Sequence, residues 1–255
     1  MEKRGQVTIF IIVAILLIAI VAFFYISSNS SNSSLGAEQI PSNIEPVYRD
    51  FQSCFEKASD EGIHYIATHG GYYEVPYETS IRYFTEEIPY YFLDSKGHIP
   101  SRNLVEKELS KYISDNLKDC FNLENYKEKG FSINGKNYSI FANIDEKIVN
   151  VKMADTLTIA KGNDTSEFDN IELDLNYNLK SLHAASVDLV DSYLEKPGSI
   201  CLTCFDKISN KNEVYINTLP IGDISVFENN IIWFYITNKD DVSENKLTWV
   251  FIVEQ

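Results

Sequence analysis

Residues 7–26 form an uncharged run, and this run constrains the chain more than any other stretch does. Thr8 and Tyr25 are its only polar side chains. At about 1.5 Å rise per residue, a helix of this length spans roughly the 30 Å of a bilayer core. A helix also satisfies its own backbone hydrogen bonds in lipid. The run therefore predicts a single transmembrane helix with the lipid bilayer as its partner.

Two positive residues, Lys3 and Arg4, stand directly before the run. Positively charged flanks of membrane helices stay in the cytoplasm. We therefore expect residues 1–26 to be a cytoplasmic tip and anchor in the cell membrane, and residues 46–255 to form an extracytoplasmic domain. Residues 27–45 would join the two as a flexible linker, because the stretch is rich in serine and asparagine.

The start of the chain also carries a processing signal. Lys3-Arg4-Gly5 followed by Gln6-Val7 resembles the archaeal class III signal, in which a prepilin-type peptidase cuts after the glycine on the cytoplasmic side. The resemblance implies that Gly5 precedes the cut and that Gln6 is the mature N-terminus. Bacterial-type pilins carry glutamate at the fifth mature position, where this chain has Phe10. The sequence therefore favours this processing over filament assembly.

The charge of the chain limits its partners. The formal net charge is −15, and almost all of it follows residue 29. Such an acidic exterior argues against nucleic acid and against docking on anionic lipid. Solubility beside a negatively charged membrane explains the excess most simply.

Four Asn-x-Ser/Thr sequons are candidate glycan acceptors in an exported chain. They begin at Asn29, Asn32, Asn137 and Asn163. Chance is the competing explanation, because the chain is rich in asparagine and serine.

The periodicity of apolar residues predicts an α+β fold. Helices are expected at about 46–69, 100–120, 180–195 and 201–209. Gly70-Gly71 ends the first helix, and Pro197 follows the third. Strands follow the second and the fourth. We expect a hairpin over 131–143 and strands at 148–153, 156–160, 168–179, 213–219, 223–227, 231–237 and 247–253. The order predicts helices packed on a meandering antiparallel sheet.

Residues 72–92 are dense in tyrosine and phenylalanine and contain Pro76 and Pro89, so a long helix is excluded there. An extended tyrosine-rich segment could bind sugar or peptide. The preferred interpretation is that the rings pack over the following helices.

The four cysteines all follow the anchor and would lie outside the cytoplasm, where disulfides persist. Three pairings are open, and the preferred one joins Cys54 to Cys120, on the inward faces of the first two helices, and Cys201 to Cys204. In another, each cysteine of the Cys201–Cys204 pair bonds one helix cysteine. A thiol-disulfide oxidoreductase site at the CxxC pair, or four thiolates on zinc, is a less favoured alternative.

Catalytic motifs are missing from the sequence: it has no nucleophile elbow, no HExxH and no phosphate-binding loop. The four histidines, His64, His69, His98 and His183, lack the spacing of metal ligands. The acidic residues are too many for any pair to be singled out as catalytic. We expect no enzyme activity, cofactor or metal.

Several features together resemble exported, membrane-anchored proteins of small-genome archaea that carry this pilin-like signal. They are the signal, the anchor, Cys54, Gly70-Gly71-Tyr72, the Cys201–Cys204 pair and Leu219-Pro220-Ile221-Gly222-Asp223. The resemblance implies a location and no chemistry. We expect a cell-surface protein with a structural or interaction role and a surface protein or glycan as partner. A pilin-like filament subunit is the first alternative, and an extracytoplasmic thiol oxidoreductase is the second.

Overall fold

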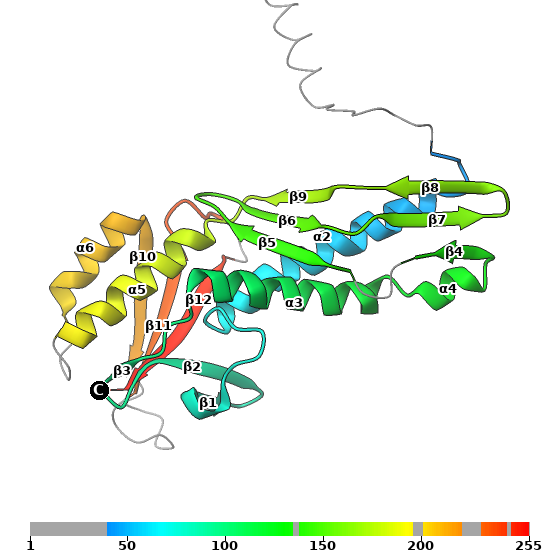
Figure 1. Ribbon diagram of the computed structural model, residues 1–255. Coiled ribbons are helices and arrows are strands. Elements are labelled where there is room, and N and C mark those ends of the chain that lie inside the picture. The colour runs from blue at the N-terminus through cyan, green and yellow to red at the C-terminus, as the bar shows by residue number, and fades with distance from the viewer. Residues whose placement is uncertain (1–39, 135–137, 196–200, 221–230, 244–245, 255) are drawn as a thin grey trace, which may run out of the picture. The chain divides into compact units, whose positions relative to one another are not determined.

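Two antiparallel helices, α2 (Glu45–Thr68) and α3 (Arg102–Cys120), form the centre of the fold (Figure 1). The computed structural model describes residues 40–134, 138–195, 201–220, 231–243 and 246–254. Within those stretches, no helix is long and apolar enough to span a bilayer. The predicted transmembrane run, the cut between Gly5 and Gln6, and most of the predicted linker lie outside them.

Both central helices agree with the apolar periodicity of the sequence. Pro46 stands in the first turn of α2, and the Ser101 hydroxyl caps α3 by accepting from the Leu104 N–H at 3.3 Å. The buried stripe of α3 consists of Val105, Leu109, Ile113 and Leu117. Leu104 and Tyr112 are half-buried, and Cys120, which was predicted on the inward face, is exposed as the last residue of the helix.

Two glycines end α2 and let the sheet approach it. Gly70 and Gly71 have φ of +54° and +85°, which other residues rarely adopt. A Cβ on Gly70 would lie 2.6 Å from the Pro89 ring and 2.9 Å from the Val250 carbonyl oxygen. A Cβ on Gly71 would lie 2.8 Å from a Val105 methyl. The two glycines that end the helix, as predicted, therefore also let the helix end lie close to the strands and to α3.

A six-stranded sheet is built from both halves of the chain. Its order is β1-β2-β12-β11-β10, with β3 paired to β2. β2 and β12 run parallel, so the predicted purely antiparallel meander is wrong. β12 pairs antiparallel with the preceding late strand β11 on one side, and the early aromatic segment supplies its parallel neighbour on the other. The strands are β1 (Ser80–Tyr83), β2 (Glu86–Leu93), β3 (Lys96–Gly97), β10 (Val214–Pro220), β11 (Ile231–Asn238) and β12 (Thr248–Glu254).

The aromatic segment 72–92 therefore lies mostly in the sheet. After the short helix η1 (Tyr77–Thr79) it forms β1 and β2. Phe92 reaches Tyr193 of α5 (Leu179–Glu195), with ring centroids 6.0 Å apart, so part of the predicted packing against helices is present. Phe84 and Tyr77 are exposed. Helices α5 and α6 (Leu202–Asn212) contact β11 and β10, respectively.

The remaining strands form two three-stranded sheets, which share a long two-stranded ribbon (Figure 1). One half pairs β6 with β9, and the other pairs β7 with β8. β5 joins β6, and β4 joins β7, beside the short helix α4 (Leu123–Lys127). The strands are β4 (Phe131–Ile133), β5 (Ile140–Ile144), β6 (Val149–Met153), β7 (Leu157–Lys161), β8 (Asp164–Phe168) and β9 (Ile171–Leu175).

This pairing corrects two predictions. The hairpin over 131–143 is wrong, because Asn134 bonds the ribbon: its N–H donates to the Thr158 carbonyl and its Oδ1 accepts from the Thr158 N–H. The strand predicted at 168–179 is confirmed only over β9, because Asn170, with φ of +52°, separates β9 from β8, and α5 begins at Leu179. The strand predicted at 223–227 lies outside the described residues.

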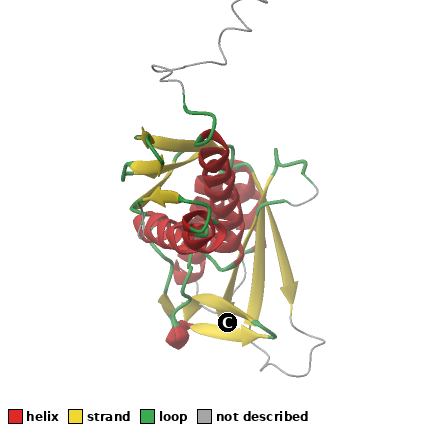
Figure 2. Cartoon of the chain, turned by 90° about the vertical axis from the view of Figure 1, so that its right-hand side faces the viewer, coloured by secondary structure: helices red, strands yellow, loops and turns green. Residues whose placement is uncertain are grey.

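The central helices lie between the ribbon and the sheet, as Figure 2 shows. α3 packs on β5, and α2 packs on β12. The mixed α+β fold is therefore as predicted.

We expect the buried tyrosines to differ sharply in their contribution to stability. The Tyr91 hydroxyl donates to the Gly70 carbonyl at 2.7 Å and accepts from Trp249 Nε1 at 3.1 Å. Tyr91→Phe should lower the free energy of unfolding by about 2 kcal/mol, because two buried groups lose their partner. Tyr193→Phe is the matched control, since the equally buried Tyr193 hydroxyl has no partner among the described residues. Urea unfolding measures both, and equal losses would contradict the expectation.

Candidate functional site

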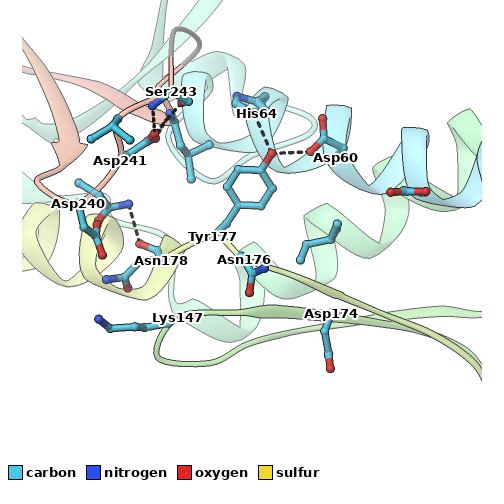
Figure 3. Close-up of a pocket in the computed structure, with 15 residues that line it drawn as sticks. Asp60, His64, Lys147, Asp174, Asn176, Tyr177, Asn178, Asp240, Asp241 and Ser243 are labelled. Carbon is cyan, nitrogen blue, oxygen red and sulfur yellow. Dashed lines mark hydrogen bonds between the residues drawn. The ribbon is translucent and has the colours of Figure 1, made fainter. Parts of the chain in front are cut away.

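A pocket of about 920 Å³ opens beside α2, where segments far apart in the sequence meet (Figure 3). Glu56, Asp60 and His64 of α2 line it, and their spacing of four places them on one helix face. Residues 174–178, which lead from β9 to α5, form a second wall. The connection from β11 to β12 and Lys147 complete it. We call this site the acidic pocket, after its carboxylates Glu56, Asp60, Asp174, Asp240 and Asp241.

Tyr177 links two walls of the acidic pocket. Its hydroxyl donates to Asp60 Oδ1 at 2.5 Å and lies 3.3 Å from His64 Nε2 (Figure 3). The His64 and Tyr177 rings meet edge to face, with centroids 5.4 Å apart. Burial, followed by the hydrogen bond to Asp60 and its charge, raises the pKa of the Tyr177 phenol above its ordinary value of 10. The phenol therefore stays a hydrogen-bond donor throughout the neutral pH range.

Asp241 fixes the wall formed by the connection from β11 to β12. Its carboxylate accepts from the Ser243 N–H at 3.0 Å, the Ser243 hydroxyl at 2.6 Å and the Leu247 N–H at 2.9 Å. Burial acts to raise the pKa of the Asp241 carboxyl, but these hydrogen bonds and the charge of Lys246 outweigh it and lower that pKa. Asp241 therefore stays ionised and contributes a negative charge to the pocket.

Asn238, at the end of β11, is a buried polar residue of the same lining, with a relative exposure of 3%. Its Nδ2 donates to the Asn178 carbonyl at 3.2 Å. Its Oδ1 has no hydrogen-bond partner among the described residues. Buried polar atoms are normally paired, so this acceptor calls for an explanation.

The cysteines form the preferred pairs. Cys54 is joined to Cys120, with Cα atoms 5.7 Å apart, and Cys201 to Cys204, with Cα atoms 5.2 Å apart. The first bond holds α2 to the last residue of α3. No described cysteine is free, which leaves no thiolate ligands for the zinc alternative. Neither disulfide is part of the acidic pocket.

The other predicted site residues lie apart from the pocket. Asn163 is exposed in the turn between β7 and β8. Asn29, Asn32 and Asn137 lie outside the described residues, as do Gly5 and Gln6.

Three of the four described histidines have separate partners, and His98 is half-buried on the chain that follows β3. His69 Nε2 lies 2.9 Å from Glu86 Oε2, His183 Nε2 donates to the Pro100 carbonyl at 2.8 Å, and His64 faces Tyr177. Within the described stretches, no three His, Cys, Asp or Glu side chains are grouped to hold a metal.

Sequence reasoning missed the acidic pocket. The spacing of Glu56, Asp60 and His64 was a usable signal for one polar helix face. The partner of that face was not visible, because Tyr177 lies 117 residues beyond Asp60.

Comparisons with protein-family models, curated proteins and solved structures gave no match to this chain.

Replacing Tyr177 tests whether it joins the walls of the acidic pocket. Tyr177→Phe should lower the free energy of unfolding by about 1 kcal/mol at pH 7, because Asp60 and His64 lose the shared hydroxyl. Tyr77→Phe is the control, since that side chain is 88% exposed. Thermal and urea unfolding compare the two, and a loss no larger than that of the control would contradict this role.

Proposed function

We propose that this chain is a single-pass cell-surface protein whose acidic ectodomain has a non-catalytic structural or interaction role. The observation that carries the proposal is the uncharged run 7–26 directly after Lys3 and Arg4. A helix of that length spans a bilayer, and its positive flank stays in the cytoplasm. Cleavage after Gly5, which makes Gln6 the mature N-terminus, belongs to the same proposal.

The disulfides support an extracytoplasmic location. Both pairs, Cys54–Cys120 and Cys201–Cys204, suit an oxidising compartment, whereas cytosolic thiols are kept reduced. The exposed Asn163 turn would be open to glycosylation there. A surface protein or glycan is the expected partner, and the acidic pocket provides a concave place for binding.

The proposed topology can be tested with a C-terminal epitope tag on the full chain. An antibody that cannot cross membranes should label intact cells, because Lys3 and Arg4 keep the N-terminus inside while the helix inserts, before the cut after Gly5. The matched control is Lys3→Glu/Arg4→Glu, which should reduce that labelling at equal expression. A tag that is labelled only after permeabilisation would contradict the proposed orientation.

Thiol–disulfide exchange at Cys201–Cys204 is a second candidate function. The observation that favours it is the place of the pair at the start of α6, where Cys201 is the N-cap residue and both cysteines are half-buried. A helix N-terminus stabilises a thiolate. In the reduced pair, the Cys201 thiolate would attack a substrate disulfide and release one substrate thiol. Cys204 would then close the pair and release the second.

A stepwise reduction experiment distinguishes exchange from a structural bond. If the pair exchanges, low concentrations of dithiothreitol should open Cys201–Cys204 before Cys54–Cys120, without loss of folded structure. The Cys201 thiol should then alkylate with an apparent pKa below the ordinary 8.5 or so of a free thiol. Mass mapping of the alkylated cysteines follows both pairs. Cys204→Ser is the control, because it removes the cysteine that would close the pair. Unfolding on opening, or an ordinary Cys201 thiol, would contradict the exchange function.

A further inference from the structure

We propose that β10 pairs edge to edge with β10 of a second copy of this chain, so that two six-stranded sheets continue into one. β10 is the last strand on one side of the six-stranded sheet (Figure 1). The inference goes beyond the proposed interaction role, because it names a second copy as the partner and one strand as the contact. It does not depend on the proposed topology.

The other edge strands of the described sheets are protected against such pairing. On β5, the Ala142 N–H donates to Ser110 Oγ at 2.9 Å. The Ile144 N–H of the same strand donates to Glu106 Oε1 at 3.1 Å, so α3 occupies that edge. β8 and β9 each contain two acidic residues, and β1, β3 and β4 are only four, two and three residues long. Cover, charge and short length are the ways in which proteins protect the edges of their sheets.

β10 lacks these protections over most of its length. Its seven residues, Val214–Pro220, include no charged side chain. Tyr215 is 51% exposed, and Asn217 is exposed as well. Copies with a formal net charge of −15 repel one another, but β10 brings no carboxylate to the contact. A long uncharged edge of this kind is a template for another strand.

Hydrogen bonding shows which groups of β10 point away from β11. The Lys239 N–H donates to the Glu213 carbonyl at 2.9 Å, and these two residues continue the β10–β11 register by one pair. Bonded and non-bonded pairs alternate along an antiparallel ladder, so the odd-numbered residues of β10 bond β11. The N–H and C=O groups of Ile216 and Thr218 therefore point outward, where no other strand among the described residues pairs with them.

These outward groups are complementary to a second copy of the same strand. In an antiparallel pair with its two-fold axis at Asn217, Ile216 lies opposite the partner's Thr218. Each such pair exchanges two hydrogen bonds, and the two-fold axis produces the pair twice. The contact therefore satisfies all four outward groups of Ile216 and Thr218 in each copy.

The ends of β10 fit the same register. Pro220 has no N–H and would lie opposite the partner's Val214. The Val214 carbonyl already accepts from the Ser209 hydroxyl at 2.6 Å, so it does not need the donor that proline lacks. An unrelated strand would have no reason to match this arrangement, which is why a second copy is the partner that fits.

Cross-linking tests the register on the full chain in detergent micelles. Asn217→Cys should form a covalent dimer under mild oxidation, because a non-hydrogen-bonded pair brings the two Cα atoms to about 4.5 Å, within reach of a disulfide. Asn143→Cys is the matched control, since it makes the same substitution at an exposed position of β5, whose edge α3 covers. Non-reducing electrophoresis compares the two variants.

A proline substitution tests the pairing without an added thiol. Thr218→Pro removes an N–H that β11 does not use, so β10 should stay in its sheet and the dimer should lose two hydrogen bonds. The dissociation constant of the dimer should rise about tenfold or more. Thr218→Val keeps the N–H and should leave that constant unchanged. Light scattering over a concentration series measures the dissociation constants, and circular dichroism checks that the variants fold.

Three results would overturn the inference: equal cross-linking of Asn217→Cys and Asn143→Cys, a full chain that stays monomeric over the whole series, or the same dissociation constant for the wild-type chain and a folded Thr218→Pro. If Thr218→Pro does not fold, the cross-linking comparison decides. None of these results bears on the epitope labelling, so a failure of this inference is distinguishable from a failure of the proposed topology.

Discussion

The fold depends on the contact between the end of α2 and the sheet. Gly70 has no side chain, so its backbone lies against Pro89 and the Val250 carbonyl, and its own carbonyl accepts from the Tyr91 hydroxyl. Tyr91 in turn accepts from Trp249 of β12. One helix end is thereby joined to both strands of the parallel pair β2–β12. This pair connects the early aromatic segment to the late strands, so the glycine contact stabilises the junction on which the six-stranded sheet is built.

Local signals were enough to predict the four long helices, but not the short α4 and η1 or the partners of the strands. Pro46, Ser101 and Gly70 act on their own neighbourhood, and the bounds of α2 and α3 follow from them. Strand pairing instead depends on residues distant in sequence. Asn134 was predicted to turn a hairpin because Asn-Gly favours such turns, but its side chain and N–H bond Thr158 of the ribbon. A single sequence contains the preference for a turn and not the competing contact.

The same limit applies to the acidic pocket. The α2 residues Glu56, Asp60 and His64 share a face that follows from helical spacing alone. Tyr177 and Asp241 reach that face only through the path of β9 and the connection from β11 to β12. No local pattern marks either residue among the many tyrosines and acids of this chain. The cysteines were easier, because four cysteines allow only three pairings, and the inward faces of the first two helices favoured the pairing that the structure has.

Helix α2 has a packed face and a polar face, and contacts at its two ends position the polar side chains. The Cys54–Cys120 bond fixes the first half of the helix, and the Gly70 contact fixes its end. The backbone positions of Asp60 and His64 between these anchors are therefore fixed by the fold itself. The Tyr177 hydroxyl, which lies 2.5 Å from Asp60 Oδ1 and 3.3 Å from His64 Nε2, joins this rigid polar face to the segment between β9 and α5. The polar face of α2 thus also has a structural contact, which depends on the two anchors that hold the helix in place.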